Sequence, residues 1–146
     1  MSNGQSHEQG AALISLTVPA KPEYVIVCRL ALDGVAEAVE LSAEAVSDLK
    51  LAVTEACANS IAHAYPEGDG AVTVDVSLLD DRVLVEVIDD GVGIPEQEVH
   101  EFREDDELRE SGMGLALISA LFDDLEIGTE SGGRGTRIAF SKPIES

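Results

Sequence analysis

Three polar side chains recur at helical spacing in the middle of the chain: Glu55, Asn59 and His63. At about 100° per residue, they fall with Asp48 within an arc of about 80° on a helix. Glu55 and Asn59 are four residues apart, so their side chains would project side by side. A carboxylate beside an amide oxygen suits a general base next to a ligand for a hard cation such as Mg²⁺. The solvent-facing stripe of an ordinary amphipathic helix would give the same pattern.

Three glycine-containing segments could also contact a ligand. Asp89–Gly93 (D-D-G-V-G) follows an apolar run, so its first carboxylate could meet a ligand's donor group while bare backbone approaches the ligand. Gly112–Gly114 precedes another apolar run, and free amides at a helix start bind anions without basic side chains. Each could instead be a plain turn or hinge, and Gly133–Thr136 alone is an ordinary hairpin turn. Neither a Walker A pattern nor G-x-G-x-x-G occurs.

Composition limits the function classes. The chain has 146 residues, enough for one domain, and 29 acidic against nine basic residues give a net charge of −20. This balance argues against nucleic acid and against an anionic membrane as partners. Cys28 and Cys57 lie in apolar stretches and are expected to be free core residues. No signal pattern and no apolar run near 18 residues occur, so we expect a cytoplasmic protein.

Periodicity predicts the elements that must position these groups. We expect a structureless tail over residues 1–10 and one domain over 11–146. The expected elements are a strand over 14–18, a helix from Pro22 to about Val39, a helix capped by Ser42 and ending near Ala64, strands 72–78 and 83–89, a loop over 91–111, a helix over 112–123, and strands near 125–130 and 135–141. This order predicts an α+β two-layer sandwich, its mixed, mostly antiparallel sheet covered by helices on one face.

Taken in order, four segments resemble the motifs of a known superfamily. E-A-C-A-N-S-I-A-H-A-Y (55–65), D-D-G-V-G-I (89–94), S-G-M-G-L (111–115) and G-T (135–136) resemble the N, G1 and G2 boxes and the closing threonine of GHKL (Bergerat-fold) ATPases. The small size and L-K-L-A-V-T-E (49–55) make the chain most similar to RsbW/SpoIIAB-type anti-sigma factors, which are serine/threonine kinases. The resemblance covers about residues 12–142.

The resemblance implies a role for each motif residue. ATP would lie between the helical layer and a lid over about 95–111, with Glu55 as general base, Asn59 as Mg²⁺ ligand and Asp89 as acceptor for the adenine amino group. Arg29 matches a position that the family uses to contact its partners. The remaining nucleotide contacts would be His63, Gly91, Gly93, Ile94, Arg109, Ser111, Gly112, Met113, Gly114, Leu115 and Thr136.

The implied function is partner switching. Such a protein sequesters a sigma factor, uses Mg-ATP to phosphorylate a serine of a STAS-domain anti-anti-sigma antagonist, and forms a homodimer. Two alternatives stay open: a nucleotide-binding regulatory module without turnover, and a kinase domain that serves a histidine phosphotransfer partner. Glu55 argues against the second, because a histidine acceptor needs no such base.

The lid segment departs from the family pattern. Glu110 stands where relatives often carry arginine, with Arg109 one residue earlier, and residues 95–111 hold eight acidic side chains. Because naked ATP would be repelled by this charge, we expect Mg²⁺ to be required for tight binding.

Overall fold

The computed structural model describes residues 11–63, 70–89, 91, 110–129 and 135–144. Its helical elements are η1 (Pro22–Tyr24), α2 (Val25–Val39), α3 (Ala43–His63) and α5 (Glu110–Leu121). Its strands are β1 (Ala11–Pro19), β2 (Ala71–Leu78), β3 (Arg82–Asp89), β4 (Glu126–Thr129) and β5 (Thr136–Pro143).

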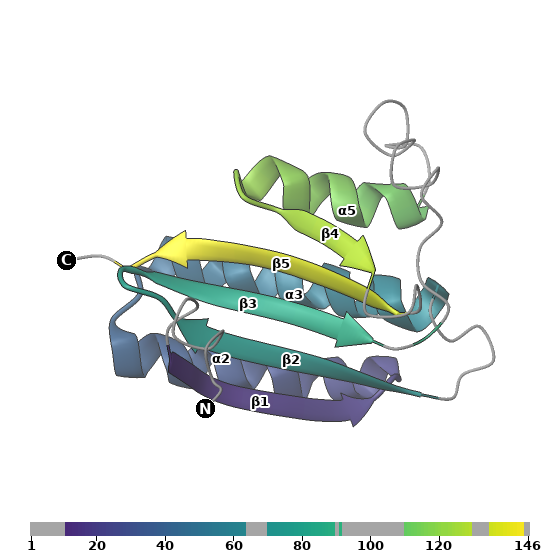
Figure 1. The fold of residues 1–146 in the computed structure, drawn as a ribbon, viewed down its shortest axis with the longest axis horizontal. Coiled ribbons are helices and arrows are strands. Elements are labelled where there is room, and N and C mark those ends of the chain that lie inside the picture. The colour runs from purple at the N-terminus through teal and green to yellow at the C-terminus, as the bar shows by residue number, and fades with distance from the viewer. Residues whose placement is uncertain (1–10, 64–69, 90, 92–109, 130–134, 145–146) are drawn as a thin grey trace.

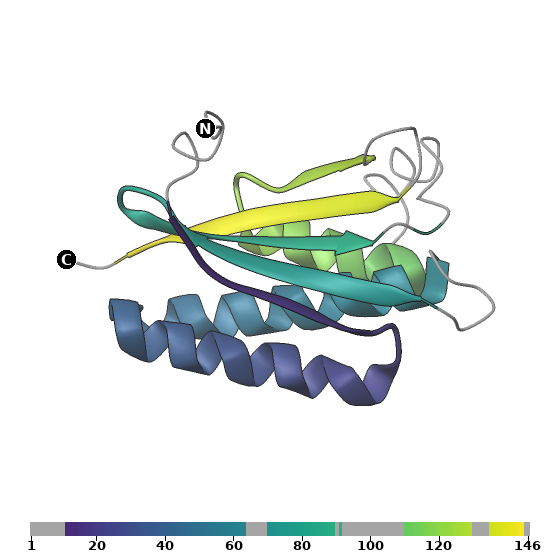
Figure 2. The ribbon, with the colours of Figure 1, turned by 60° about the horizontal axis from the view of Figure 1, so that its bottom comes forward.

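The five strands form one sheet in the order β1-β2-β3-β5-β4 (Figure 1). Each neighbouring pair is antiparallel, so the described sheet contains no parallel pair and is antiparallel rather than mixed. The helices lie together on one side of it, as Figure 2 shows. The predicted α+β two-layer sandwich is confirmed.

The core lies between the sheet and the helices. Alternating valines of β2 and β3 point into it, and Val76 and Val85 are opposite one another in the register and fully buried. Leu32 of α2, Leu49 of α3 and Ile118 of α5 pack onto these strands. The period of two seen in the sequence therefore marks the covered face of the sheet.

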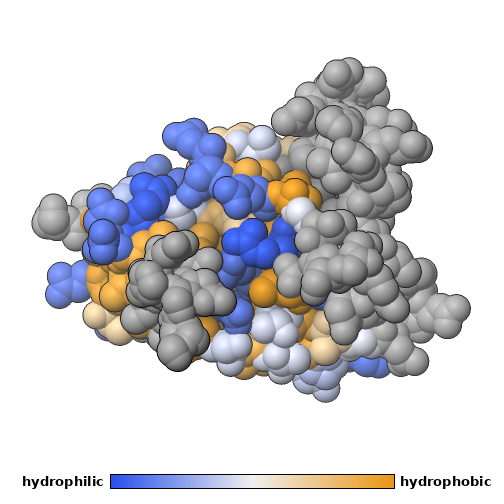
Figure 3. All heavy atoms as spheres, in the orientation of Figure 1, coloured by the Kyte–Doolittle hydropathy of each residue, from blue (hydrophilic) through white to orange (hydrophobic). Residues whose placement is uncertain are grey.

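None of the described helices covers the opposite face of the sheet. Cross-strand polar pairs line it: Thr17 with Thr73 at 2.8 Å, Ser15 with Asp75, and Arg137 with Glu86. Figure 3 looks onto this face and shows hydrophilic residues crossing the middle of the sheet between hydrophobic ones. Among the described residues, no helix has the length and apolar character needed to cross a membrane.

Helix boundaries follow local chemistry. Ser42 caps α3, because its Oγ accepts a hydrogen bond from the Ala45 amide at 3.0 Å, as predicted. Helix α5 differs from the prediction, since it begins at Glu110 and ends at Leu121 rather than spanning 112–123. An acidic residue stabilises a helix start, whereas Asp123 and Asp124 oppose the dipole at a helix end. Both boundaries therefore lie two residues earlier than expected.

Candidate functional site

The ends of two neighbouring strands create a buried polar site. Asp89 ends β3, Thr136 begins β5, and the two are directly opposite in the register. The Gly135 amide donates to the Gly91 carbonyl at 2.9 Å, and the Gly91 amide donates to Asp89 Oδ1 at 3.0 Å. Gly135 has a φ of 80°, which a side chain would disfavour. A backbone hydrogen bond thus connects Gly91, which follows β3, to Gly135, which precedes β5.

Two side-chain oxygens at this site have no partner within the described part of the chain. Asp89 and Thr136 are each 3% exposed, and neither Asp89 Oδ2 nor Thr136 Oγ1 makes a hydrogen bond there. A buried polar atom without a partner costs about 1–3 kcal/mol. One pure acceptor and one hydroxyl, which can donate or accept, are suited to the edge of a nitrogen heterocycle.

Helix α3 brings the other candidate side chains to the same end of the molecule. Its last turns lie near the tip of β3 and the start of β5 in both ribbon views (Figures 1 and 2), and α3 packs against both strands and α5. Asn59 is buried at 8% exposure, and Glu55, one turn earlier, is half-buried.

The polar stripe on α3 only borders the solvent face of the helix. The exposed positions are Ala43, Glu44, Ser47, Leu51, Ala58 and Ala62, and they adjoin the stripe on the side of the half-buried Glu55. Ala52 lies within the arc of the polar stripe and is fully buried. The alternative of a plain solvent-facing stripe is therefore wrong for Asn59, which lies inside the protein.

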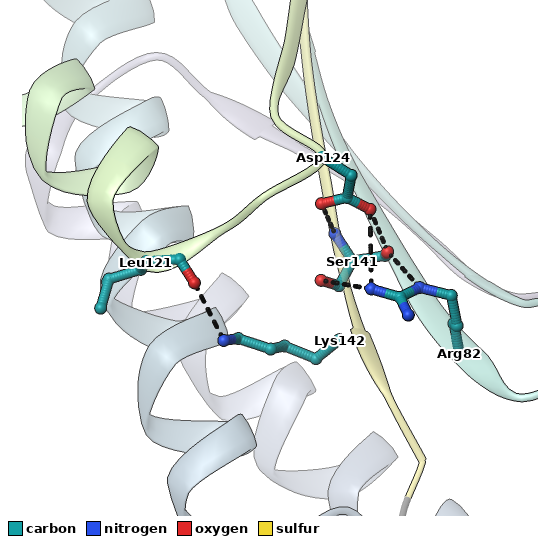
Figure 4. A network of polar contacts seen from close by, with 5 residues as sticks. All are labelled: Arg82, Leu121, Asp124, Ser141 and Lys142. Carbon is teal, nitrogen blue, oxygen red and sulfur yellow. Dashed lines mark hydrogen bonds and ion pairs between the residues drawn. The ribbon is translucent and has the colours of Figure 1, made fainter.

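A polar network fixes the sheet at the other end, far from Asp89 along β3. Asp124 accepts hydrogen bonds from the Ser141 amide and hydroxyl, and Arg82 donates to Ser141 Oγ at 2.8 Å (Figure 4). Lys142 donates to the carbonyl of Leu121, the last residue of α5, at 3.0 Å. This network anchors the C-terminal end of α5, and hence holds the helix whose first turn carries the G2 box.

The remaining predicted residues are placed in part. Gly112 lies in the first turn of α5, where amides lack intrahelical partners, whereas Gly114 lies deeper in the helix. Gly112 and Gly114 therefore lie inside the helix, as the predicted range 112–123 has them, but two residues further from its start. Of His63, Ser111, Met113 and Leu115 only the helical backbone is described, and Gly93, Ile94 and Arg109 lie outside the described residues. Their roles stay predictions.

Helix α3 also carries a buried hydroxyl, on Ser60, and a buried thiol, on Cys57. Ser60, which the sequence reasoning did not select, is 2% exposed, and its hydroxyl has no partner among the described residues. The sequence did contain a signal for Ser60: it is a polar residue on the same helix face as the apolar Leu49 and Val53, which are buried. Cys57 lies between Glu55 and Asn59 in the sequence but faces the core. A hydrogen bond with the Cys28 thiol, together with burial, raises the pKa of Cys57, so this thiol is no nucleophile.

A separate groove of about 810 Å³ lies between α2 and α3. Arg29 is exposed at its edge, and Lys50 forms an ion pair with Asp33 at 3.0 Å within it. Much of the exposed apolar surface is nearby, with Ile26 at 56% and Leu30 at 61% exposure on α2. Such a surface is typical of a protein interaction site.

The fold and the four segments define a histidine kinase-like ATPase domain. The family model of that description matches residues 18–142. The serine-protein kinase RsbW of Listeria monocytogenes is 42% identical over 127 residues, which is 82% of this chain and 81% of that protein. RsbW of Bacillus subtilis is 36% identical over 133 residues, covering 86% and 83%. The chain belongs to the RsbW branch of the histidine kinase-like ATPase family.

A solved structure supports the fold independently. The SiaB–SiaC complex of Pseudomonas aeruginosa contains a chain with a TM-score of 0.73 at 17% identity, and the match covers 94% of each chain. At this identity the similarity establishes the architecture alone.

The described residues fit the expected Mg-ATP. The unpartnered Asp89 Oδ2 and Thr136 Oγ1 provide polar contacts for a base. No cluster of three metal-ligating side chains occurs in the described ranges.

Proposed function

We propose that this protein is an ATP-dependent serine-protein kinase that also acts as an anti-sigma factor. The observation that supports the proposal is the pair of buried side-chain oxygens of Asp89 and Thr136 that have no partner among the described residues, at the end of the sheet that the last turns of α3 reach. The curated relatives, which are named serine-protein kinases, favour turnover over the alternative of a regulatory module without it.

Each described residue then has one task. Asp89 Oδ2 accepts a hydrogen bond from the adenine amino group, and Thr136 contacts the same base. Asn59 would hold Mg²⁺ through its amide oxygen. ATP would supply the γ-phosphoryl group, which passes to the serine oxygen as its bond to ADP breaks and ADP leaves, and most of the catalysis is positioning and charge neutralisation. Glu55 accepts the proton of the incoming serine hydroxyl, which strengthens that oxygen as a nucleophile.

The partners follow from the same family. We infer that a sigma factor is the sequestered protein and that a STAS-domain anti-anti-sigma protein carries the target serine. Arg29 and the apolar residues Ile26 and Leu30 form the surface on α2 that we assign to partner contact. A homodimer is part of this proposal. Because phosphorylation adds nearly two negative charges, it would release the antagonist from a protein that already carries −20.

Phosphotransfer tests the proposal directly. The protein is incubated with Mg²⁺, γ-labelled ATP and an extract of its source organism, and the acid stability of the product label is measured. We expect an acid-stable label on a small protein, lost with Glu55→Gln and retained with Glu44→Gln. Glu44 is a matched control because it is an exposed carboxylate on the same helix.

The other outcomes discriminate among functions. ATP binding without any label would support the regulatory module and contradict the kinase. An acid-labile label would indicate a phosphohistidine and a different pathway. Equal labelling by wild type and Glu55→Gln would show that the base is assigned wrongly.

A further inference from the structure

One hydroxyl on α3 has no role in the site as described so far. Ser60 is 2% exposed, and its Oγ makes no hydrogen bond within the described part of the chain. An unpaired buried hydroxyl is costly, and natural structures contain few of them. Such a group calls for a specific explanation.

The same helix shows how a hydroxyl is ordinarily satisfied. Thr54 Oγ1 donates to the carbonyl of Lys50, four residues earlier, at 2.8 Å. Serine and threonine in helices commonly make this bond. Ser60 does not make it, although it lies in a continuous stretch of α3. Its hydroxyl is therefore available for something other than its own helix.

The position of Ser60 on α3 indicates what its hydroxyl could contact. Within the described chain, the buried side-chain atoms without partners are Ser60 Oγ, Asp89 Oδ2 and Thr136 Oγ1. Asp89 and Thr136 face each other across β3 and β5, and α3 packs against both strands. The last turns of α3 lie at that end of the sheet in both views (Figures 1 and 2). Ser60 begins the last turn of α3, so the three residues belong to elements that meet at this end of the sheet.

We infer that Ser60 is a third polar contact for the adenine base and helps to determine base specificity. Its hydroxyl can donate to a ring nitrogen while accepting from a donor, directly or through a water shared with Asp89 and Thr136. One carboxylate acceptor, Asp89 Oδ2, and two rotatable hydroxyls would then surround one heterocycle. The inference rests on the proposed function only in requiring that the site hold ATP.

The test is Ser60→Ala, measured in two ways on the whole protein. Calorimetric titration with Mg-ATP should give a Kd about fivefold weaker than wild type, the expected cost of one neutral hydrogen bond. The Tm without nucleotide should be unchanged or up to about 3 °C higher, because the substitution removes an unpaired buried hydroxyl. Ser47→Ala, on the exposed side of α3, is the matched control and should match wild type in both measurements.

The outcomes separate this inference from the kinase proposal. If Ser60→Ala binds Mg-ATP as wild type does, or if its affinity and nucleotide-free Tm fall together, Ser60 is only structural and the inference is wrong. If the wild type binds Mg-ATP but transfers no phosphate, the kinase proposal is contradicted. The Mg-ATP affinity and the nucleotide-free Tm of Ser60→Ala still decide whether Ser60 contacts the base. A wild type that does not bind Mg-ATP would overturn both.

Discussion

At the scale of single residues, the proposed site depends on buried polar atoms that have no partner among the residues that the structure describes. Asp89 uses Oδ1 to hold the Gly91 amide, which fixes the carboxylate and directs its other oxygen elsewhere. Burial at 3% exposure removes competition from water, so a hydrogen bond from a ligand counts for more there than at the surface. One carboxylate thereby shapes the loop and is free to recognise a base.

Asp89→Asn tests this division of roles. The amide side chain keeps the shape and can still bind the Gly91 amide, but its second group is a donor where an acceptor is needed. Hydrogen bonds to charged groups contribute about 1.5–3 kcal/mol, so we expect ATP affinity to fall about 10- to 100-fold and the preference for ATP over GTP to shrink. Competition titrations with both nucleotides measure this. Asp80→Asn, in the exposed turn before β3, should leave both values unchanged.

The residue scale is also where sequence reasoning reached its limit. The spacing of Glu55 and Asn59 indicated a shared helix face, which the structure confirms. The same arc included Asp48, yet this carboxylate forms an ion pair with Lys142 at 3.0 Å and serves packing. Ser60 was missed because helical periodicity places it with the core. A partner distant in the sequence decided the role of Asp48, whereas Ser60 lies on the core-facing side of α3 without a partner among the described residues.

At the scale of elements, the strands were easier to predict than α5. Valines alternating through β2 and β3 match a sheet with one covered face, so their position follows from the pattern alone. Helix α5 contains two glycines in its first half, and the prediction began the helix at the first of them, two residues too late. Tertiary contacts outweigh the low helix propensity of glycine here, since Ile118 and Phe122 anchor this segment in the core.

Lys142 provides a test of how α5 is held. Its ammonium group bonds the Leu121 carbonyl, pairs with Asp48 and lies 4.7 Å from the centre of the Phe122 ring. Lys142→Met removes these contacts and leaves Asp48, whose side chain is 19% exposed, without its cation. We expect a loss of about 1–3 kcal/mol, or a Tm about 3–9 °C lower, in thermal unfolding.

Lys50→Met is the control for that experiment. Lys50 pairs with Asp33, whose side chain is 45% exposed, on the groove between α2 and α3. Exposed ion pairs contribute only about 0–1 kcal/mol. Equal losses in the two variants would mean that Lys142 does not anchor α5 more strongly than a surface pair holds two helices.

At the scale of the whole molecule, the proposed nucleotide site and the proposed partner surface lie on different elements. The proposed nucleotide site lies at one end of the sheet, whereas the exposed apolar residues Ile26 and Leu30 lie on α2. The groove beside them shares no residue with Asp89 or Thr136. The proposed partner surface and the proposed nucleotide site are thus formed by different residues, as a kinase that also binds a partner would require.

The net charge of −20 gives the last prediction. Free ATP carries several negative charges, and a strongly acidic protein repels it unless a cation intervenes. We expect ATP affinity in EDTA to be at least about tenfold weaker than in Mg²⁺ at low ionic strength. The difference should narrow as KCl is added, because salt screens the long-range repulsion but not the direct contact with Asn59. ATP titrations in Mg²⁺ and in EDTA, each at two KCl concentrations, measure the affinity difference and its change with salt.

Asn59→Ala distinguishes the proposed contact between Asn59 and Mg²⁺ from the long-range repulsion between ATP and the acidic protein. If the Asn59 amide oxygen holds Mg²⁺, the variant should bind ATP in Mg²⁺ more weakly than wild type and differ little from it in EDTA. Its buried position makes a fold defect the main alternative, which the nucleotide-free Tm reports. Equal ATP affinity with and without Mg²⁺ in the wild type would mean that the acidic surface lies too far from the phosphates to repel them.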